Sequence, residues 1–257
     1  MENALKLREK LQKGVVCFGA AITFSDPTVT EALAGSLDFV WIDAEHGPHT
    51  IQTIQSHIMA TKGSECAPIV RVPWNDPVLI KPVLDAGAAG IIAPMVCTAD
   101  EARRLVAACL YPPDGIRGFG PRRPSNYGQS MNPEFCKSAN TAIIPIAQIE
   151  HITAVKNIDA ILDVPGIAAI LIGPFDLAGS MGHSGDPGHP EVQRAIDSVI
   201  AAGRRKNVYV GMGITDDPKS ADPLIKKGVS WLCIPPDYML LLQSAKRFAT
   251  AIRGVGA

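Results

Sequence analysis

The chain has 257 residues, 47% of them hydrophobic, which is enough to bury one large α/β core. Its 24 basic and 25 acidic residues nearly cancel and the longest basic run is residues 204–206, so a nucleic-acid partner, which requires a basic stripe, is not expected. No apolar run approaches the roughly 18 residues of a membrane-spanning helix, and residues 1–14 form no signal peptide, so no membrane partner is expected.

After an amphipathic helix expected over residues 1–14, short apolar runs alternate with longer amphipathic runs along the whole chain. The apolar runs are typical of buried parallel strands and the amphipathic runs of helices. Strands are expected at residues 15–21, 39–44, 69–72, 90–96, 142–149, 168–172, 208–212 and 231–234. Helices are expected at residues 28–35, 50–61, 77–86, 99–110, 153–162, 191–206, 219–227 and 238–252. Several of the 6 cysteines fall inside the strand runs and none forms a Cys-x-x-Cys pair, which favours buried thiols in a cytoplasmic chain.

Eight strand–helix units in about 250 residues are typical of an α/β protein with a (β/α)8 TIM barrel. A doubly wound open sheet also alternates strands and helices, but it more often has a glycine-rich phosphate loop after its first strand, and none follows residues 15–21 here. The sequence therefore predicts one barrel domain over residues 1–257. Two long connections rich in proline and glycine, residues 111–134 and 173–190, could cover an active site.

Polar side chains gather where four of the predicted strands end, and this is the end of a barrel that carries the active site. Residues two apart on a strand point to the same side, so Gln148 and Glu150 are expected to lie together. The polar residues at these strand ends are Asp43, Glu45, His46, Arg71, Gln148, Glu150 and Asp176.

Glu150 and Asp176 are candidate ligands for a hard dication such as Mg²⁺ or Mn²⁺, because two carboxylates leave room for water and substrate oxygens. The alternative for each is capping of the following helix. His46, with Asp43 three residues before it, could act as a general base, or it could be a hydrogen-bonded histidine of the rim. A zinc site at His46 and His49 is disfavoured, because the intervening Gly-Pro forces a turn.

Arginines provide candidate anion contacts. Arg71 could clamp a carboxylate or stabilise an enolate oxygen, or it could pair with a rim acid such as Glu45. Asp85 lies near the end of the helix expected at 77–86, and composition alone favours an ordinary exposed acidic residue of that helix. In the first long connection, three arginines could meet a distal acidic group of a substrate or face solvent: Arg117, Arg122 and Arg123.

Five stretches together resemble the HpcH/HpaI aldolase family, the metal-dependent (class II) pyruvate aldolases. The resemblance extends from about residue 15 to residue 250 and implies a barrel of the phosphoenolpyruvate/pyruvate type. The stretches are WIDAEHGPH at 41–49, VRVPWNDP at 70–77, IIAPMV at 91–96, YPPDGIRG at 111–118, and QIE at 148–150 with IGPFDL at 172–177.

The resemblance implies a role for each candidate residue. Glu150 and Asp176 would hold one divalent metal ion (Mg²⁺, Mn²⁺ or Co²⁺), Gln148 would contact metal-bound water, and Arg71 would lie beside the pyruvyl oxygen. The backbone of the turn at 173–176, which consists of Gly173, Pro174, Phe175 and Asp176, would receive the pyruvate carboxylate.

Proton transfer is implied for a second set of residues. His46 would be the acid–base histidine, with Asp43 as its supporting carboxylate. Asp85 would reach that histidine from a neighbouring subunit. The family forms homo-hexamers, trimers of dimers, so the resemblance also implies that the helix at 238–252 is exchanged between subunits.

The activity implied is reversible cleavage of 4-hydroxy-2-oxo acids into pyruvate and an aldehyde through a metal-stabilised enolate. No lysine stands at a predicted strand end, which argues against Schiff-base chemistry. The alternatives are a citrate-lyase-type acyl-CoA lyase, oxaloacetate decarboxylation at the same centre, and a non-catalytic barrel that binds an oxo acid. The loop at 118–127 departs from the family pattern, as do Phe18, His151 and His183, so the aldehyde is left open.

Overall fold

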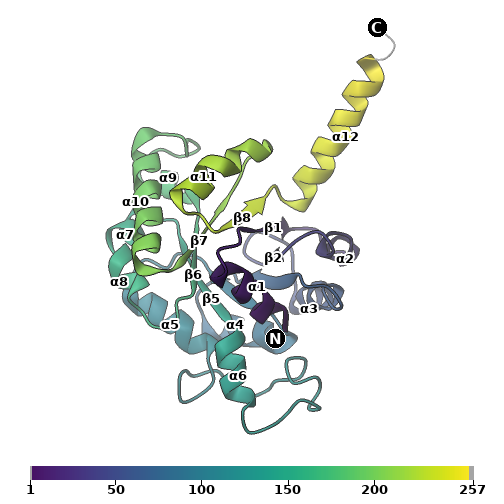
Figure 1. Cartoon of the computed structure of the whole chain (residues 1–257), viewed down its shortest axis with the longest axis vertical. Coiled ribbons are helices and arrows are strands. Elements are labelled where there is room, and N and C mark those ends of the chain that lie inside the picture. The colour runs from purple at the N-terminus through teal and green to yellow at the C-terminus, as the bar shows by residue number, and fades with distance from the viewer. Residues whose placement is uncertain (1, 255–257) are drawn as a thin grey trace.

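The computed structural model describes residues 2–254, in which eight parallel strands close into a barrel (Figure 1). Each strand pairs with the next along the chain, and β8 pairs with β1. The predicted (β/α)8 fold is confirmed; Met1 and residues 255–257, which belong to the predicted domain, lie outside the described residues. The strands are β1 (Cys17–Ile22), β2 (Phe39–Asp43), β3 (Ala67–Arg71), β4 (Gly90–Ala93), β5 (Ile144–Ile149), β6 (Ala169–Ile172), β7 (Tyr209–Gly213) and β8 (Trp231–Ile234).

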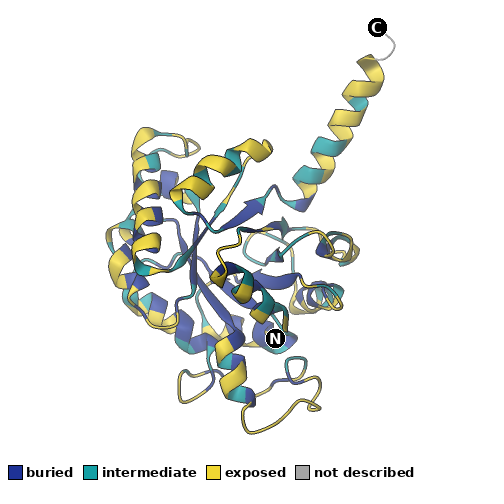
Figure 2. Ribbon diagram, viewed as in Figure 1, coloured by how far each residue is buried: buried dark blue, intermediate teal, exposed yellow. Residues whose placement is uncertain are grey.

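Most of the helices surround the barrel, with buried residues toward the strands and exposed residues outward (Figure 2). They are α1 (Glu2–Gln12), α2 (Thr28–Ala34), α3 (Ile51–Ala60), α4 (Pro77–Ala86), α5 (Ala99–Cys109), α6 (Phe135–Ala142), α7 (Ile152–Lys156), α8 (Ile158–Leu162), α9 (Pro174–Ser180), α10 (Pro190–Lys206), the 3-10 helix η1 (Pro218–Ser220), α11 (Ala221–Lys227) and α12 (Asp237–Gly254).

Local signals explain where these helices begin and end, as α4 illustrates. The Asp76 side chain accepts a hydrogen bond from the Val78 N–H, and Pro77 occupies the first turn, where its missing N–H costs nothing. Gly87 ends the helix with a φ of 106°, a left-handed conformation that favours glycine. The sequence therefore fixes both ends of α4 at the residues predicted for it.

Several predicted boundaries are wrong. The helix expected at 153–162 is divided at Asn157, whose side chain donates to the Cys97 carbonyl at 2.9 Å, and forms α7 and α8 instead. The strand expected at 90–96 ends at Ala93, because Met95 has a φ of 55° and turns the chain out of the sheet. Two helices were not predicted: α6, which takes the first residue of the strand expected at 142–149, and α9, inside the connection 173–190.

The barrel interior changes from apolar to polar along the strands. Phe39, Ile69 and Ile146 belong to one buried apolar cluster, which also contains Leu7 and Leu11 of α1. Helix α1 therefore closes the amino-terminal end of the barrel. Following the period of two from these residues leads to Asp43, Arg71 and Gln148, the last interior layer at the carboxyl ends of the strands. The interior thus leaves its polar groups at one open end.

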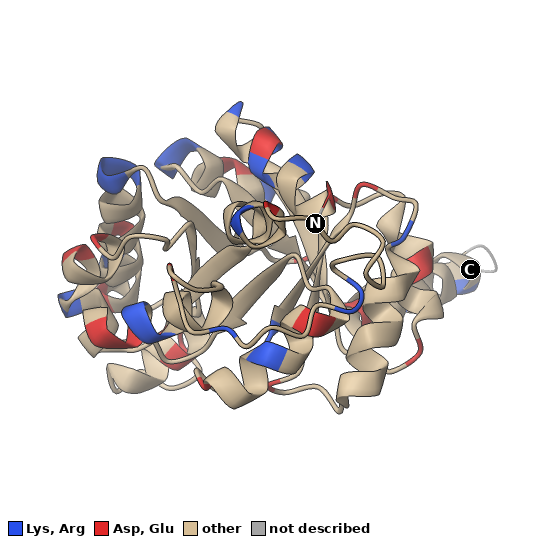
Figure 3. Ribbon diagram, turned by 90° about the horizontal axis from the view of Figure 1, so that it is seen from below, with Lys and Arg blue, Asp and Glu red and all other residues tan. Residues whose placement is uncertain are grey.

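Helix α12 extends away from the barrel (Figure 1) and exposes large apolar side chains. These are Tyr238, Leu241, Leu242, Phe248 and Ile252. Within residues 2–254, none of the helices combines the length and the hydropathy that crossing a bilayer requires. Basic and acidic residues alternate along the helices and loops in the view of Figure 3.

A buried histidine makes stability depend on pH. His57 on α3 is 0% exposed, its Nδ1 lies 2.8 Å from Thr30 Oγ1, and burial together with nearby His49 lowers its pKa to about 4 from 6.5. His57 therefore binds a proton more readily in the unfolded chain. Its contribution to the free energy of unfolding is fully present above about pH 6.5 and is lost as the pH is lowered toward 4.

We expect the free energy of unfolding to fall by about 3 kcal/mol more in the wild type than in His57→Gln between pH 7 and pH 4. Urea titrations at a series of pH values measure this difference. Because the comparison uses the slope with pH, a uniform loss of stability in the variant does not affect it. Parallel pH profiles of the two proteins would show that His57 does not carry the effect.

Candidate active site

Two adjoining cavities, each of about 510 Å³, open at the carboxyl ends of the strands. One extends over β6 and the turn at 173–176, and the other over β1 and β8. The residues common to both are Trp41, His46, Arg71, Gly213 and Ile214. Five of the seven polar rim residues predicted from the sequence line this space, which is large enough for a small organic acid: Asp43, His46, Arg71, Gln148 and Asp176. Glu45 and Glu150 line neither cavity.

Arg71 is the most constrained polar group at this mouth. Its Nε and Nη2 donate to the two oxygens of Asp43 at 2.9 and 2.7 Å, and its Nη1 lies 3.1 Å from Glu45 Oε2. The guanidinium also lies 4.5 Å from the centroid of the Trp41 ring. Burial alone would raise the pKa of Asp43, but the hydrogen bonds and charge of Arg71 outweigh burial and lower it. The pairing of Arg71 with a rim acid, one of the predicted alternatives, is thus present, and it aims the arginine at the cavity.

Glu150 directly follows β5 and is buried. Its carboxylate accepts hydrogen bonds from the Met95 N–H at 2.7 Å and from the Gln148 side chain, so Gln148 and Glu150 do lie together. Burial raises the pKa of Glu150, and the charge of Asp176 raises it further. Gly173 packs against this carboxylate, where a Cβ would lie only 2.8 Å from Glu150 Oε2. A side chain at position 173 would therefore displace Glu150.

The helix-capping alternative does not describe either acid. Helix α7 is capped by His151, whose ring accepts from the Thr153 N–H, and not by Glu150. Gly173, the residue that precedes α9, provides no side-chain cap. Asp176 is exposed in the first turn of the helix. The charge of Asp176 raises the proton affinity of Glu150. Two carboxylates in an oxygen-rich site suit a hard dication, because a cation between them relieves their repulsion. The residues present therefore fit a divalent metal ion.

His46 has a different carboxylate neighbour from the one predicted. Its side chain is 68% exposed, and its Nε2 lies 3.9 Å from Glu45 Oε2. Asp43 accepts the backbone N–H groups of Glu45 and His46, at 3.1 and 3.3 Å, and so orients the turn rather than the ring. Burial raises the pKa of Glu45. The charge of Arg71 partly offsets this rise, and the charge of Glu150 adds to it. Glu45 is thus part of the rim network, as its position after the second predicted strand indicated, and it contacts both Arg71 and His46.

Asp85 is not at the mouth formed by its own chain. It lies on α4, where its Oδ1 accepts from Arg117 Nη2 at 2.8 Å. Arg117 is buried and lies over the Tyr111 ring. It therefore faces neither solvent nor the active-site mouth, where it was expected to meet solvent or a distal acidic group of a substrate. Asp85 also lines a separate surface pocket with Arg122 and Arg123 of the long loop.

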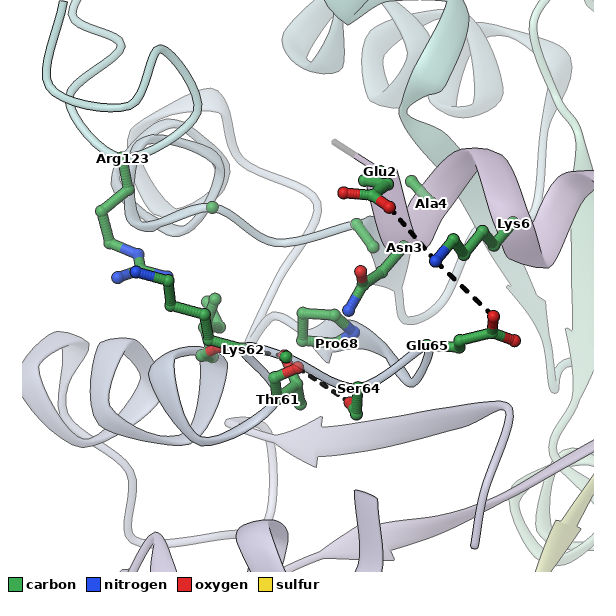
Figure 4. A pocket seen from close by; sticks show the side chains of 14 residues that line it. Glu2, Asn3, Ala4, Lys6, Thr61, Lys62, Ser64, Glu65, Pro68 and Arg123 are labelled. Carbon is green, nitrogen blue, oxygen red and sulfur yellow. Dashed lines mark hydrogen bonds and ion pairs between the residues drawn. The ribbon is translucent and has the colours of Figure 1, made fainter. Parts of the chain in front are cut away.

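A further cavity of about 470 Å³ lies at the opposite end of the barrel, between α1 and the segment at 61–65 (Figure 4). Three of its charged side chains pair with one another, because Lys6 Nζ lies 3.1 Å from Glu2 and 3.6 Å from Glu65. Arg123, another lining residue, donates to the Ala86 carbonyl at 2.8 Å. Residues at this end of such barrels serve stability rather than catalysis. This cavity therefore does not compete with the mouth as an active site.

Comparison with known proteins agrees with the geometry of the mouth. Residues 22–241 match the family model HpcH/HpaI aldolase/citrate lyase. The chain is 38% identical over 250 residues to a 4-hydroxy-2-oxo-heptane-1,7-dioate aldolase of Salmonella paratyphi C, covering 97% of this chain and 94% of that protein.

Solved structures give the same result. An HpcH/HpaI aldolase/citrate lyase family protein from Burkholderia cenocepacia has a TM-score of 0.91 and 31% identity, covering 98% of this chain and 99% of that one. The citrate synthase SbnG has a TM-score of 0.86 and 25% identity, covering 99% of both chains. The resemblance seen in the five motifs is confirmed: the chain is a carbon–carbon lyase that belongs to the HpcH/HpaI aldolase/citrate lyase family.

Proposed function

We propose that this enzyme is a divalent-metal-dependent aldolase that reversibly cleaves 4-hydroxy-2-oxo acids into pyruvate and an aldehyde. The observation that carries the proposal is the convergence of Glu150, Gln148 and Arg71 beside Asp176 at one barrel mouth. The relatives named as 4-hydroxy-2-oxo-heptane-1,7-dioate aldolases support the same reaction.

In this proposal Glu150 and Asp176 would hold the metal ion (Mg²⁺, Mn²⁺ or Co²⁺), and Gln148 would contact a water bound to it. The metal supplies Lewis-acid polarisation of the oxo acid when bound. Arg71 donates hydrogen bonds to the oxygen on which negative charge develops, and its fixed position means that little reorganisation is needed as the charge forms. Asp43 and Glu45 hold Arg71 in that position.

The remaining residues bind the carboxylate and transfer the proton. The turn formed by Gly173, Pro174 and Phe175 receives the carboxylate of the oxo acid at the edge of the cavity. During cleavage His46 accepts the proton of the C4 hydroxyl, and it returns a proton in the addition direction. Asp43 orients the turn that carries His46, and we propose that Asp85 of a neighbouring subunit approaches the same histidine.

Assembly is part of this proposal. We propose a homo-hexamer, a trimer of dimers, in which single-domain subunits exchange α12. The apolar side chains that α12 exposes support an exchange, because burial against a neighbour would remove them from water. Light scattering of the intact chain measures the assembly directly.

We also propose a cytoplasmic location. The six cysteines are free, and four of them are buried: Cys17, Cys66, Cys109 and Cys233. Burial raises the pKa of Cys66 to about 12, so its thiol stays protonated and unreactive. Thiols of this kind are typical of chains that work in a reducing compartment.

Removal of the metal tests the function. We expect excess EDTA to abolish pyruvate release from a 4-hydroxy-2-oxo acid. Without the cation, only Arg71, already paired with Asp43 and Glu45, would offset the negative charge of Glu150 and Asp176 beside the developing enolate. Readdition of Mg²⁺, Mn²⁺ or Co²⁺ should restore the rate, measured by coupled oxidation of NADH with lactate dehydrogenase. Equal rates with and without EDTA would exclude the proposal. If activity depends on the metal, a panel of aldehydes scored for pyruvate addition defines the second substrate.

A further inference from the structure

Two histidines and a glutamate meet outside the site described above. His183 lies in the connection after α9, His189 directly precedes α10, and Glu191 is in the first turn of α10. One potential ligand atom from each residue lies within 4.8 Å of the other two. The imidazole rings stack with their centroids 3.5 Å apart, and His183 Nε2 lies 3.2 Å from Glu191 Oε2.

The backbone holds these three side chains together before any ligand arrives. Gly182 and Gly185 have φ values of 85° and 81°, left-handed conformations that let the chain turn twice within a few residues. The Gln193 side chain donates to the Pro187 carbonyl at 2.8 Å and ties the loop to α10. Little conformational entropy is therefore lost when a ligand binds to the cluster.

We propose that His183, His189 and Glu191 form a second metal centre, for a borderline divalent cation such as Zn²⁺, Ni²⁺ or Cu²⁺. Imidazole nitrogens suit these ions, whereas the oxygen-rich pair Glu150 and Asp176 suits Mg²⁺ or Mn²⁺. The hydrogen bond to His183 lowers the pKa of Glu191, so its carboxylate is charged at neutral pH. Ligands about 2.1 Å from a tetrahedral metal lie about 3.4 Å apart, which side-chain rotations achieve from the present positions. Three protein ligands leave a fourth position for water.

This centre would act on the wall of the active-site cavity. Pro187 and Gly188, between the two histidines, line the same cavity as Asp176 and Phe175. A metal ion that bridges His183 to the start of α10 closes the loop at 183–189 and fixes this part of the wall. Binding is independent of the proposed reaction, because no ligand is shared with the centre at Glu150.

The test is Ni²⁺ and Cu²⁺ binding to the untagged chain. The double variant His183→Gln/His189→Asn removes both imidazoles, while Gln can still donate to Glu191 and Asn can still cap α10. We expect the variant to bind one fewer Ni²⁺ per chain in equilibrium dialysis. The electron paramagnetic resonance spectrum of bound Cu²⁺ should show coupling to two imidazole nitrogens in the wild type, and the variant should lose it.

Two controls separate this centre from the catalytic one. Ser184→Ala changes the same loop without removing a ligand, and it should keep the wild-type Ni²⁺ stoichiometry. Glu150→Gln should keep the imidazole-coupled Cu²⁺ signal even where Mn²⁺ binding is lost. Equal Ni²⁺ stoichiometry in the wild type and the double variant, or a Cu²⁺ spectrum without imidazole coupling, would overturn the proposal. Thermal melts in metal-free buffer check that the double variant is folded.

Discussion

Replacing Glu150 by glutamine is expected to abolish divalent-metal binding and to lower kcat/KM for pyruvate-forming cleavage by at least about 1,000-fold. Glutamine keeps the volume of the side chain, and its amide oxygen can still accept the Met95 N–H bond seen at 2.7 Å. The substitution removes the negative charge that faces Asp176. It also replaces the oxygen that accepts from Gln148 by an NH2 group, to which Gln148 can present its own amide oxygen by turning over. A loss of activity would therefore report the charge and not a collapse of the barrel mouth.

Calorimetric titration with Mn²⁺ measures the first effect, and single-substrate kinetics measure the second. Glu134→Gln, which removes an exposed carboxylate beside α6, is the matched control and should bind Mn²⁺ as the wild type does. Unchanged Mn²⁺ affinity in Glu150→Gln would contradict the assignment of Glu150 as a ligand. Full cleavage activity together with weakened Mn²⁺ binding would instead show that cleavage does not require the metal.

Arg71→Lys is expected to lower kcat/KM by about 100-fold or more and the free energy of unfolding by about 2 kcal/mol. A lysine ammonium cannot reproduce the paired bonds to Asp43 while also reaching Glu45, so a buried carboxylate loses its partner. It also cannot present a fixed pair of donors to the developing oxyanion. Both losses come from the planar geometry of the guanidinium, since the charge is conserved.

Mn²⁺ binding separates this effect from that of Glu150, because Arg71→Lys leaves both proposed ligands in place and should retain metal affinity. Arg104→Lys on α5, an exposed arginine paired with Glu101 at 3.6 Å, is the matched substitution and should change neither quantity appreciably. Wild-type kcat/KM in Arg71→Lys would rule out the proposed role of the guanidinium in the reaction.

The strand period made much of the site predictable. Asp43 and Arg71 end neighbouring strands and are direct partners in the β2–β3 register, so their pairing follows from the barrel itself. Gln148, on β5, and Glu150, directly after it, are two residues apart, and this spacing predicted their contact. That inference uses only local periodicity, which the sequence displays directly. The sequence indicated Glu45 rather than Asp43 as the acid paired with Arg71, although the register alone places Asp43 beside it.

Other contacts depend on backbone turns that no periodicity marks. The Met95 N–H reaches Glu150 because Met95 takes a left-handed φ of 55°, which is uncommon for a residue with a side chain. The ring of His46 approaches Glu45 because the chain turns directly after β2, and the strand alternation expected beyond Asp43 therefore stops. Asp85 meets Arg117 through the long loop, whose irregular course the sequence does not specify.

The closure of one barrel end by α1 constrains the order of events in the proposed reaction. Leu7 and Leu11 pack into the apolar interior, so substrate and both products must pass through the single open mouth. The oxo-acid half would bind beside the buried Arg71 and Glu150, and the aldehyde half nearer the exposed His46. The aldehyde then has to leave before pyruvate can. Pyruvate, as the last product to dissociate, would compete directly with the substrate for the free enzyme, and the aldehyde would not.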